Sequence, residues 1–270
     1  MSPTPLDGFT VASRTYDGQA RDVYRRGEGP AVVVIHEIPG ITDAVARFAT
    51  TVADRGYSVF APRLFGHVGR PMSTGASLVQ IARACVSAEM RVLASDATSP
   101  VVSWLRALAR DAHAEVGGPG VGVLGMCLTG NFALAMMVDP WVAAPVLSQP
   151  SLPFVVSART RAGLHVSPED LATVKERTRA GARLLGLRFT DDFMCPRARF
   201  DRLRAELGDG FEAIEIDSSP GNPHGIPRTA HSVLTVDLVD EVGHPTRAAL
   251  DRVLAFFDER LKGSSAPAAP

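Results

Sequence analysis

The sequence has no long hydrophobic run and no strong excess of either charge. A membrane-spanning helix needs an apolar run of about 18 residues or more, and none is present. The net charge of −1 argues against the basic face that would bind nucleic acid or a membrane surface. The first residues carry neither the basic nor the apolar segment of a secretory signal. We therefore expect a cytoplasmic protein with no nucleic-acid or membrane partner.

Cysteine is scarce. The three cysteines, Cys85, Cys127 and Cys195, are far apart and form neither a disulfide framework nor a CxxC metal site. Free thiols agree with a cytoplasmic location. With 46% hydrophobic residues in a chain of 270, there is enough apolar side chain for one sizeable core. We predict a single domain over residues 1–262 and a disordered, low-complexity tail at 263–270.

Strand-like and helix-like segments alternate along most of the chain. The β-branched run at 31–36 is typical of a strand that is covered on both faces. This alternation predicts an α/β fold with a doubly wound, mainly parallel sheet and helices on both faces. The expected strands are 9–16, 20–26, 31–36, 57–62, 120–126, 143–148, 183–189 and 211–216. The expected helices are 43–56, 75–95, 99–115, 128–138, 167–181, 196–207 and 244–261.

The stretch GVGVLGMCLTG places Cys127 on a turn between a predicted strand and a predicted helix. Such a turn lifts a nucleophile out of the sheet, and the positive end of the following helix favours the reactive thiolate. The tight turn needs small residues two positions to each side. Gly125 meets this need, but Thr129 stands on the other side, with Gly130 one position later, and is expected to crowd the turn. The alternative is a buried structural cysteine.

Partners for a nucleophile follow in the order that α/β-hydrolases use, which is nucleophile, acid and then histidine. Asp191 and Asp192 come directly after one predicted strand, and His224 and His231 come after the next. In a triad, the acid orients the imidazole, and the imidazole activates the nucleophile and protonates the leaving group. From order and position alone, either aspartate and either histidine could serve.

Three motifs, VVVIHEIPGI, GMCLTG and RFTDDFMCP, resemble those of the dienelactone hydrolase family, a cysteine-using branch of the α/β-hydrolases. The resemblance extends approximately from Ala31 to Leu261. It implies an α/β-hydrolase fold and cleavage of an ester or lactone of a small organic acid. It also implies that no metal or organic cofactor is needed and that the partner is a small-molecule substrate.

The resemblance also implies roles for individual residues. Cys127 would be the nucleophile, His231 the base and acid, and Asp192 the orienting partner. The family's aspartate lies four residues before a proline, which selects Asp192 over Asp191. The family's histidine precedes the last helix by roughly two dozen residues, which favours His231 over His224.

Two further features of the family map onto this chain. The backbone N–H groups of Ile38 and Leu128 would form an oxyanion hole that stabilises charge on the substrate carbonyl. Glu37 would occupy the position of a glutamate that helps to deprotonate the thiol when substrate binds; the alternative is a carboxylate at the start of a helix.

The chain departs from the family in three places. Thr129 replaces a glycine of the nucleophile motif. The segment 150–181 is longer than expected and is predicted to form a lid or pocket wall. Thr235 stands where dienelactone-processing members carry an arginine that grips the substrate carboxylate. Candidate replacements are Arg63, Arg70 and Arg83, although solvated arginines are an equally good interpretation.

Two other functions fit the sequence. A non-catalytic ligand-binding protein of the same fold is expected if Thr129 spoils the turn. A thiol peroxidase would form a peroxide-dependent sulfenic acid at Cys127.

Overall fold

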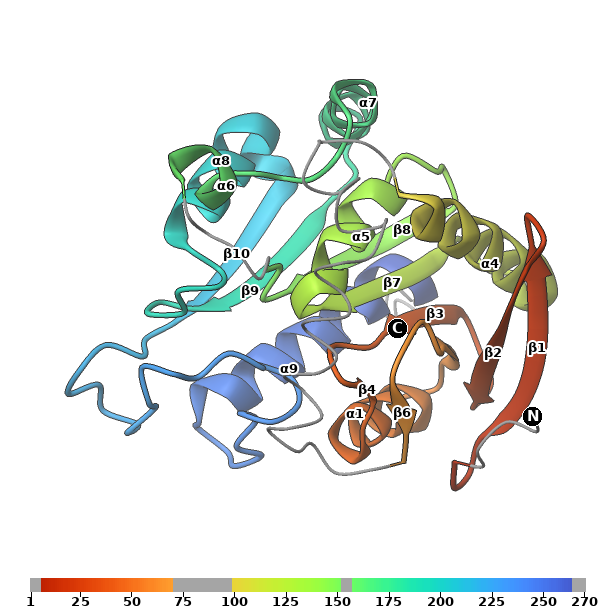
Figure 1. Cartoon of the computed structure of the whole chain (residues 1–270), viewed down its shortest axis with the longest axis horizontal. Coiled ribbons are helices and arrows are strands. Elements are labelled where there is room, and N and C mark those ends of the chain that lie inside the picture. Colours follow the sequence, from red (N-terminus) through yellow and green to blue (C-terminus); the bar gives the residue numbers. More distant parts are fainter. Residues whose placement is uncertain (1–5, 70–98, 152–156, 264–270) are drawn as a thin grey trace, which may run out of the picture.

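In the computed structural model, an eight-stranded sheet runs through the centre of the molecule, and helices cover both of its faces (Figure 1). The structure describes residues 6–69, 99–151 and 157–263. In spatial order, the strands are β1 (Thr10–Tyr16), β2 (Gln19–Arg26), β5 (Ser58–Pro62), β3 (Ala31–Ile35), β7 (Val121–Met126), β8 (Val142–Ser148), β9 (Leu184–Phe189) and β10 (Phe211–Ile216). A separate parallel pair joins β4 (Gly40–Ile41) to β6 (His67–Val68).

The sheet is parallel from β5 to β10, and only the β1–β2 hairpin at one edge pairs antiparallel with its neighbours. Strands β3, β5, β7 and β9 are buried along their whole length. This burial follows from helices on both faces and explains their continuous apolar sequences. The predicted doubly wound, mainly parallel α/β fold is confirmed.

The helices divide into two layers. Side chains of α4, α5, α7 and α8 pack on one face of the sheet, and those of α1 and α9 pack on the other. The bounds are α1 (Asp43–Asp54), α4 (Pro100–Val116), α5 (Gly130–Met136), α6 (Ala158–Arg161), α7 (Pro168–Arg179), α8 (Arg197–Leu207) and α9 (Pro245–Phe257). Short helical turns are η1 (Cys127–Thr129), η2 (Gly208–Gly210) and η3 (Asp258–Lys262). Within the described ranges, no helix is long and apolar enough to cross a membrane.

Helix starts follow the capping residues that the sequence offers. The Ser99 hydroxyl accepts a hydrogen bond from the Val101 N–H, and Pro100 follows it as the first helical residue. At the start of α7, the Ser167 hydroxyl accepts a hydrogen bond from the Asp170 N–H at 3.0 Å, and Pro168 is the first helical residue. The predicted helix at 75–95 and residues 264–270 of the predicted tail lie outside the described residues.

Part of the segment predicted as a lid has a different place in the fold. Helix α7 connects β8 to β9, and its Val174 is buried in the same apolar layer as α5 and α8. Two neighbouring parallel strands need a crossover connection, which is usually a helix. Residues 168–179 are therefore the crossover helix of the β8–β9 pair, and a lid role for the rest of the segment stays a prediction.

The order of the strands creates a topological switch point. β3 lies between β5 and β7, and the chain leaves β3 toward α1 on one face but leaves β7 toward α5 on the other. In open α/β sheets, ligands bind outside the carboxyl ends of strands at such a switch point. Residues 36–38 follow β3, and Cys127 follows β7, so the predicted site residues lie at this position.

Candidate active site

Cys127 occupies a strained turn between β7 and α5. Its φ is +56°, in the left-handed region that residues other than glycine rarely adopt. Gly125 and Gly130 leave the room that the turn requires. A Cβ on Gly125 would lie 2.1 Å from the Thr129 carbonyl oxygen, and one on Gly130 would lie 2.9 Å from Pro150 Cα. The turn presents a partly exposed thiol at the carboxyl edge of the sheet.

Thr129 does not disrupt this turn. Its side chain is fully buried, and its hydroxyl accepts a hydrogen bond from the Met126 N–H at 3.0 Å. The same hydroxyl lies 3.0 Å from the Ile35 carbonyl oxygen and 3.1 Å from that of His36. The expectation that Thr129 crowds the turn was wrong, because the hydroxyl finds backbone partners at the end of β3.

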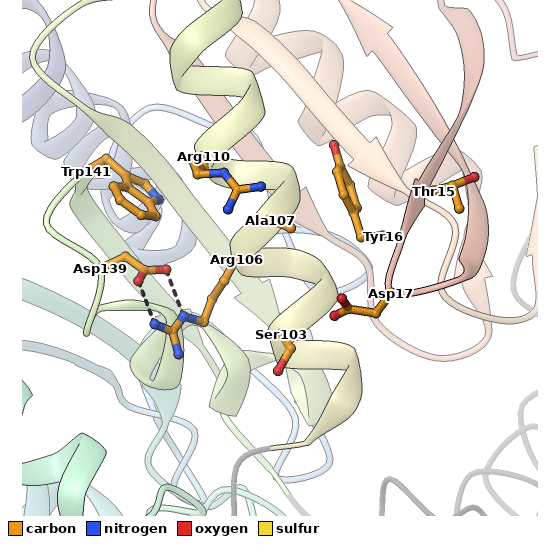
Figure 2. Close-up of a pocket in the computed structure, with 9 residues that line it drawn as sticks. All are labelled: Thr15, Tyr16, Asp17, Ser103, Arg106, Ala107, Arg110, Asp139 and Trp141. Atoms are coloured by element: carbon orange, nitrogen blue, oxygen red, sulfur yellow. Dashed lines mark hydrogen bonds and ion pairs between the residues drawn. The ribbon is translucent and has the colours of Figure 1, made fainter.

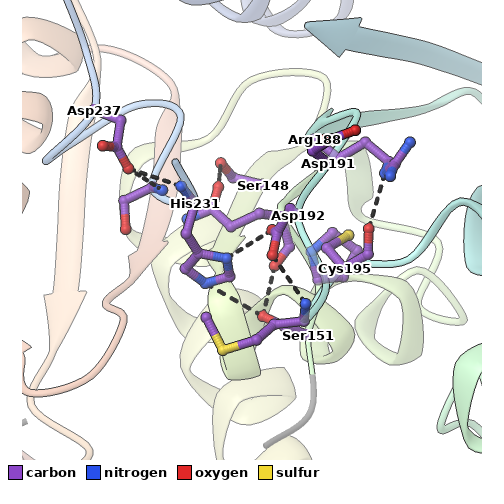
Figure 3. Close-up of polar contacts among 12 residues, drawn as sticks. Ser148, Ser151, Arg188, Asp191, Asp192, Cys195, His231 and Asp237 are labelled. Atoms are coloured by element: carbon purple, nitrogen blue, oxygen red, sulfur yellow. Dashed lines mark hydrogen bonds and ion pairs between the residues drawn. The ribbon is translucent and has the colours of Figure 1, made fainter. Parts of the chain in front are cut away.

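His231 and Asp192 meet beside this turn (Figure 3). Asp192 follows β9, and its Oδ2 lies 2.7 Å from Nδ1 of His231. The Asp192 side chain is only 2% exposed, and its Oδ1 also accepts a hydrogen bond from the Met194 N–H. The carboxylate is therefore fixed on both sides and can orient the imidazole.

The competing residues have other partners. The Asp191 carboxylate pairs with Arg228 at 2.8 Å, and its side chain is 25% exposed. The ring of His224 packs edge-on against His244, with 5.2 Å between ring centroids. The structure thus brings together Asp192 and His231, and it does not bring Asp191 or His224 to the imidazole–carboxylate pair.

The imidazole of His231 interacts with Cys127 as well as with Asp192. Burial by itself would lower the pKa of His231. The neighbouring Cys127 and the hydrogen bond with Asp192 outweigh burial and hold this pKa well above its usual value. A raised pKa favours the imidazolium form of His231, and a positive charge beside the sulfur is what a cysteine nucleophile needs.

Two further groups hold the histidine in place. Oδ2 of Asp237 accepts hydrogen bonds from the backbone N–H groups of His231 and Ser232, both at 2.8 Å (Figure 3). On the other side of the ring, Ser151 Oγ lies 3.5 Å from Nε2 of His231. The Ser151 N–H also donates to the Cys127 carbonyl oxygen at 3.0 Å, which ties the segment after β8 to the nucleophile turn.

Glu37 is buried at the end of β3, but its hydrogen-bond partners are not the thiol. Its carboxyl accepts hydrogen bonds from Ser232 Oγ at 2.8 Å, from Thr235 Oγ1, and from Gln149 Nε2 at 3.3 Å. Burial raises the pKa of Glu37, against the opposing effects of the Thr235 hydrogen bond and the nearby His231. A direct action on Cys127 would require the carboxyl to leave these three partners.

The raised pKa of Glu37 predicts how its contribution to stability depends on pH. As the pH rises from about 4.5, the unfolded state loses the Glu37 proton first, so ionisation favours unfolding. We expect the free energy of unfolding of the wild type to fall relative to that of Glu37→Gln as the pH rises above about 4.5 and through the raised pKa of Glu37. Urea denaturation of both proteins between pH 4 and 8 measures this difference, and a constant difference would contradict the assigned shift.

Two backbone N–H groups, those of Ile38 and Leu128, are candidates to stabilise an oxyanion. Leu128 is in the first turn after β7, where helical geometry leaves N–H groups without intrahelical acceptors. Among the described residues, no acceptor is found for the Ile38 N–H. Both groups follow strands at the switch point, Ile38 after β3 and Leu128 after β7, and their role as an oxyanion hole stays a prediction.

Of the predicted anion grips, only Arg63 is among the described residues. Arg63 pairs with Asp22 at 2.9 Å, beside a hollow of about 260 Å³ that also involves residues 20–22 and 64–66. Arg70 and Arg83 lie outside the described residues. Thr235, at the position of the family's arginine, donates its hydroxyl proton to Glu37.

A separate hollow of about 490 Å³ lies between the β1–β2 turn, α4 and the start of β8 (Figure 2). Trp141 is one of the residues that line it. Arg106, another lining residue, forms a bidentate ion pair with Asp139 (Figure 2). None of its lining residues is a cysteine or histidine, so it offers no nucleophile–base pair.

Sequence reasoning missed four polar residues at the site: Gln149, Ser151, Ser232 and Thr235 as a partner of Glu37. Gln149 and Ser151 directly follow β8, which neighbours the nucleophile strand. Their position after a strand end was the available signal. Within the described part of the chain, no group of three or more metal-binding side chains could hold a metal ion.

Comparisons with known proteins agree with this geometry. The model of the dienelactone hydrolase family matches residues 18–261. A carboxymethylenebutenolidase of Rhodococcus opacus is 27% identical over 247 residues, which cover 89% of this chain and 85% of that protein.

Solved structures share the fold. A putative dienelactone hydrolase from Klebsiella pneumoniae superposes with a TM-score of 0.59 at 16% identity, covering 94% of this chain and all of that one. A cold-adapted esterase from an Arctic intertidal metagenomic library gives 0.57 at 15% identity, covering 96% and 97% of the two chains. The architecture is therefore that of the α/β-hydrolases.

Proposed function

Because the chain belongs to the dienelactone hydrolase family and is an ester or lactone hydrolase, we propose that Cys127, His231 and Asp192 carry out the cleavage. The observation that supports the proposal is that Asp192, which follows β9, hydrogen-bonds to His231, and that His231, in the loop after β10, interacts with Cys127 at the end of β7. The Asp192–His231 distance of 2.7 Å and the raised pKa of His231 support it.

In the first half of the proposed reaction, the Cys127 thiolate attacks the carbonyl carbon of the substrate. The carbonyl oxygen becomes an oxyanion, which accepts hydrogen bonds from the Ile38 and Leu128 N–H groups. When the tetrahedral intermediate collapses, the bond from carbon to the leaving oxygen breaks. The proton on His231 passes to that oxygen, which leaves a thioester on Cys127 and a neutral imidazole.

In the second half, water attacks the thioester carbonyl and gives its proton to His231. The same two N–H groups stabilise the second oxyanion. Collapse of this intermediate expels the Cys127 thiolate, releases the carboxylic acid and restores the imidazolium–thiolate pair. Asp192 holds the ring in one orientation through both halves and stabilises its charged form.

The substrate class follows from the family and from the site. The R. opacus relative is named for a butenolide, which is a lactone. In this chain, Thr235 stands at the position of the family's arginine and hydrogen-bonds to Glu37, Arg63 pairs with Asp22, and Arg228 pairs with Asp191. We therefore propose short acyl esters and lactones without a free carboxylate as the preferred substrates.

Selective alkylation tests the proposal. We expect the purified protein to hydrolyse p-nitrophenyl acetate and simple lactones, and iodoacetamide to abolish this activity in step with modification of Cys127. Cys195 should stay unmodified, because it is buried and burial raises the pKa of its thiol to about 12. Peptide mass mapping measures both sites. Full activity after complete Cys127 modification would refute the cysteine mechanism, and no turnover of any ester or lactone would favour the ligand-binding alternative.

A further inference from the structure

His36 is a fully buried histidine between β3 and the predicted oxyanion loop. Its Nε2 lies 3.1 Å from the backbone nitrogen of Leu64, and its Nδ1 lies 2.9 Å from the carbonyl oxygen of Glu37. A backbone N–H can only donate, so Nε2 must be the unprotonated acceptor. The ring proton is therefore on Nδ1, which donates to the Glu37 carbonyl.

This tautomer is stable across the working range of pH. Burial lowers the pKa of His36 to about 4, with a smaller opposing contribution from the Glu37 hydrogen bond. The ring also packs edge-on against Phe65, with 4.6 Å between ring centroids. His36 is thus a neutral group in a fixed orientation, distinct from the titrating His231.

The Glu37 carbonyl and the Ile38 N–H belong to one peptide unit. A peptide unit is planar, and in its trans form the C=O and N–H bonds point in opposite directions. The Glu37 oxygen accepts two hydrogen bonds, from His36 Nδ1 and from the Gly40 N–H at 2.9 Å. Fixing the direction of this carbonyl therefore fixes the direction of the Ile38 N–H.

We propose that His36 is a positioning residue for the oxyanion hole, which holds the Glu37–Ile38 peptide so that the Ile38 N–H faces the substrate carbonyl at Cys127. The inference rests on the proposed function. Thr129 supports the preceding peptide in the same way, because its hydroxyl lies 3.1 Å from the His36 carbonyl oxygen. His36 itself does not touch the substrate.

The expected effect of replacing His36 follows from how much one oriented hydrogen-bond donor contributes to kcat. Removing one oxyanion-hole donor from an enzyme lowers kcat by roughly 10²- to 10³-fold. When the His36 hydrogen bond is lost, the Glu37 carbonyl still accepts a hydrogen bond from the Gly40 N–H. The Ile38 N–H is therefore less well oriented but is still present. We expect kcat to fall by about 10- to 100-fold while KM changes little, because the oxyanion forms only after substrate binding.

Matched variants separate the two nitrogen atoms of His36. Asparagine places an amide N–H near the position of Nδ1 and can still donate to the Glu37 carbonyl. Glutamine reaches the position of Nε2 and can accept from the Leu64 N–H, but it leaves Glu37 without the side-chain donor. Phenylalanine keeps the ring and removes both polar contacts. We expect His36→Asn to stay close to wild type in kcat, and His36→Gln and His36→Phe to show the loss.

The rate at which iodoacetamide alkylates Cys127 distinguishes a positioning role of His36 from a purely structural one. Alkylation of Cys127 requires the thiolate but forms no oxyanion, so its rate should be the same in wild type, His36→Gln and His36→Phe. Hydrolysis of p-nitrophenyl acetate should fall in the two variants. A parallel fall in alkylation and hydrolysis, equal losses in His36→Asn and His36→Gln, or an unchanged kcat in His36→Gln would each overturn the inference. Failure of the proposed function appears separately, as wild-type hydrolysis that survives modification of Cys127.

Discussion

Replacing Cys127 with alanine is expected to lower kcat/KM for p-nitrophenyl acetate by about 10⁴-fold or more, because the substitution removes the nucleophile and with it the thioester route. The residual rate would come from substrate binding and the oxyanion donors alone. Steady-state kinetics with the purified variant measure the loss. Binding of substrate should persist, since the alanine side chain is smaller than the thiol and the strained turn is held by Gly125, Thr129 and Gly130.

Cys195→Ala is the matched control for this experiment. Cys195 is buried after β9, and the burial that raises the pKa of its thiol to about 12 keeps it protonated at neutral pH. Its loss removes a small packed side chain and should leave kcat/KM within about twofold of wild type, at the cost of some stability. Cys127→Ser retains an oxygen nucleophile and should fall between Cys127→Ala and wild type. If Cys127→Ala retained full activity, the proposed mechanism would be wrong.

Much of the architecture could be predicted because it depends on local sequence. The β-branched run of β3 and the Ser99–Pro100 start of α4 carry their own signals, and alternation of the elements sets the parallel sheet. The nucleophile turn was visible for the same reason, since Gly125 and Cys127 stand two positions apart on one strand end.

Contacts between distant segments were not predictable in this way. Thr129 was expected to crowd its turn, because the sequence alone shows only the bulk that its side chain adds to the nucleophile motif. The structure accommodates it because β3 pairs with β7 in a register that brings the carbonyl groups of Ile35 and His36 to its hydroxyl. Likewise, Glu37 contacts Gln149 and Ser232, which lie in loops far along the chain, and only the folded structure brings these groups together.

The choice between Asp191 and Asp192 depends partly on local sequence and partly on contacts between distant segments. The sequence favours Asp192 only through the spacing of the family's motif, because both residues follow the same strand. In the structure, successive residues of the turn after β9 point in different directions. Asp192 turns inward to His231, and Asp191 turns outward to Arg228.

Asp192→Asn is expected to lower kcat/KM by roughly 10²- to 10⁴-fold, because the amide cannot stabilise the imidazolium and can hold the ring in the wrong tautomer. Asp191→Asn is nearly isosteric and removes only a surface ion pair, whose contribution is small, so its kcat/KM should stay within about twofold of wild type. The two variants differ by one position in the chain, and kinetics on both measure the contrast directly. The opposite ranking would place the orienting carboxylate on Asp191.

The pH profile of kcat/KM for Asp192→Asn distinguishes a lost interaction with the His231 ring from a general destabilisation of the fold. The Asp192 carboxylate is one of the groups that raise the pKa of His231, so its replacement should move the His231 titration to lower pH. If a neutral imidazole acts as the base, the acidic limb of kcat/KM shifts down. If the imidazolium–thiolate pair is the active form, the alkaline limb shifts down, because the ring loses its proton earlier. A variant that merely destabilises the fold lowers kcat/KM at every pH and leaves both limbs in place, and that result would remove Asp192 from the proposed triad.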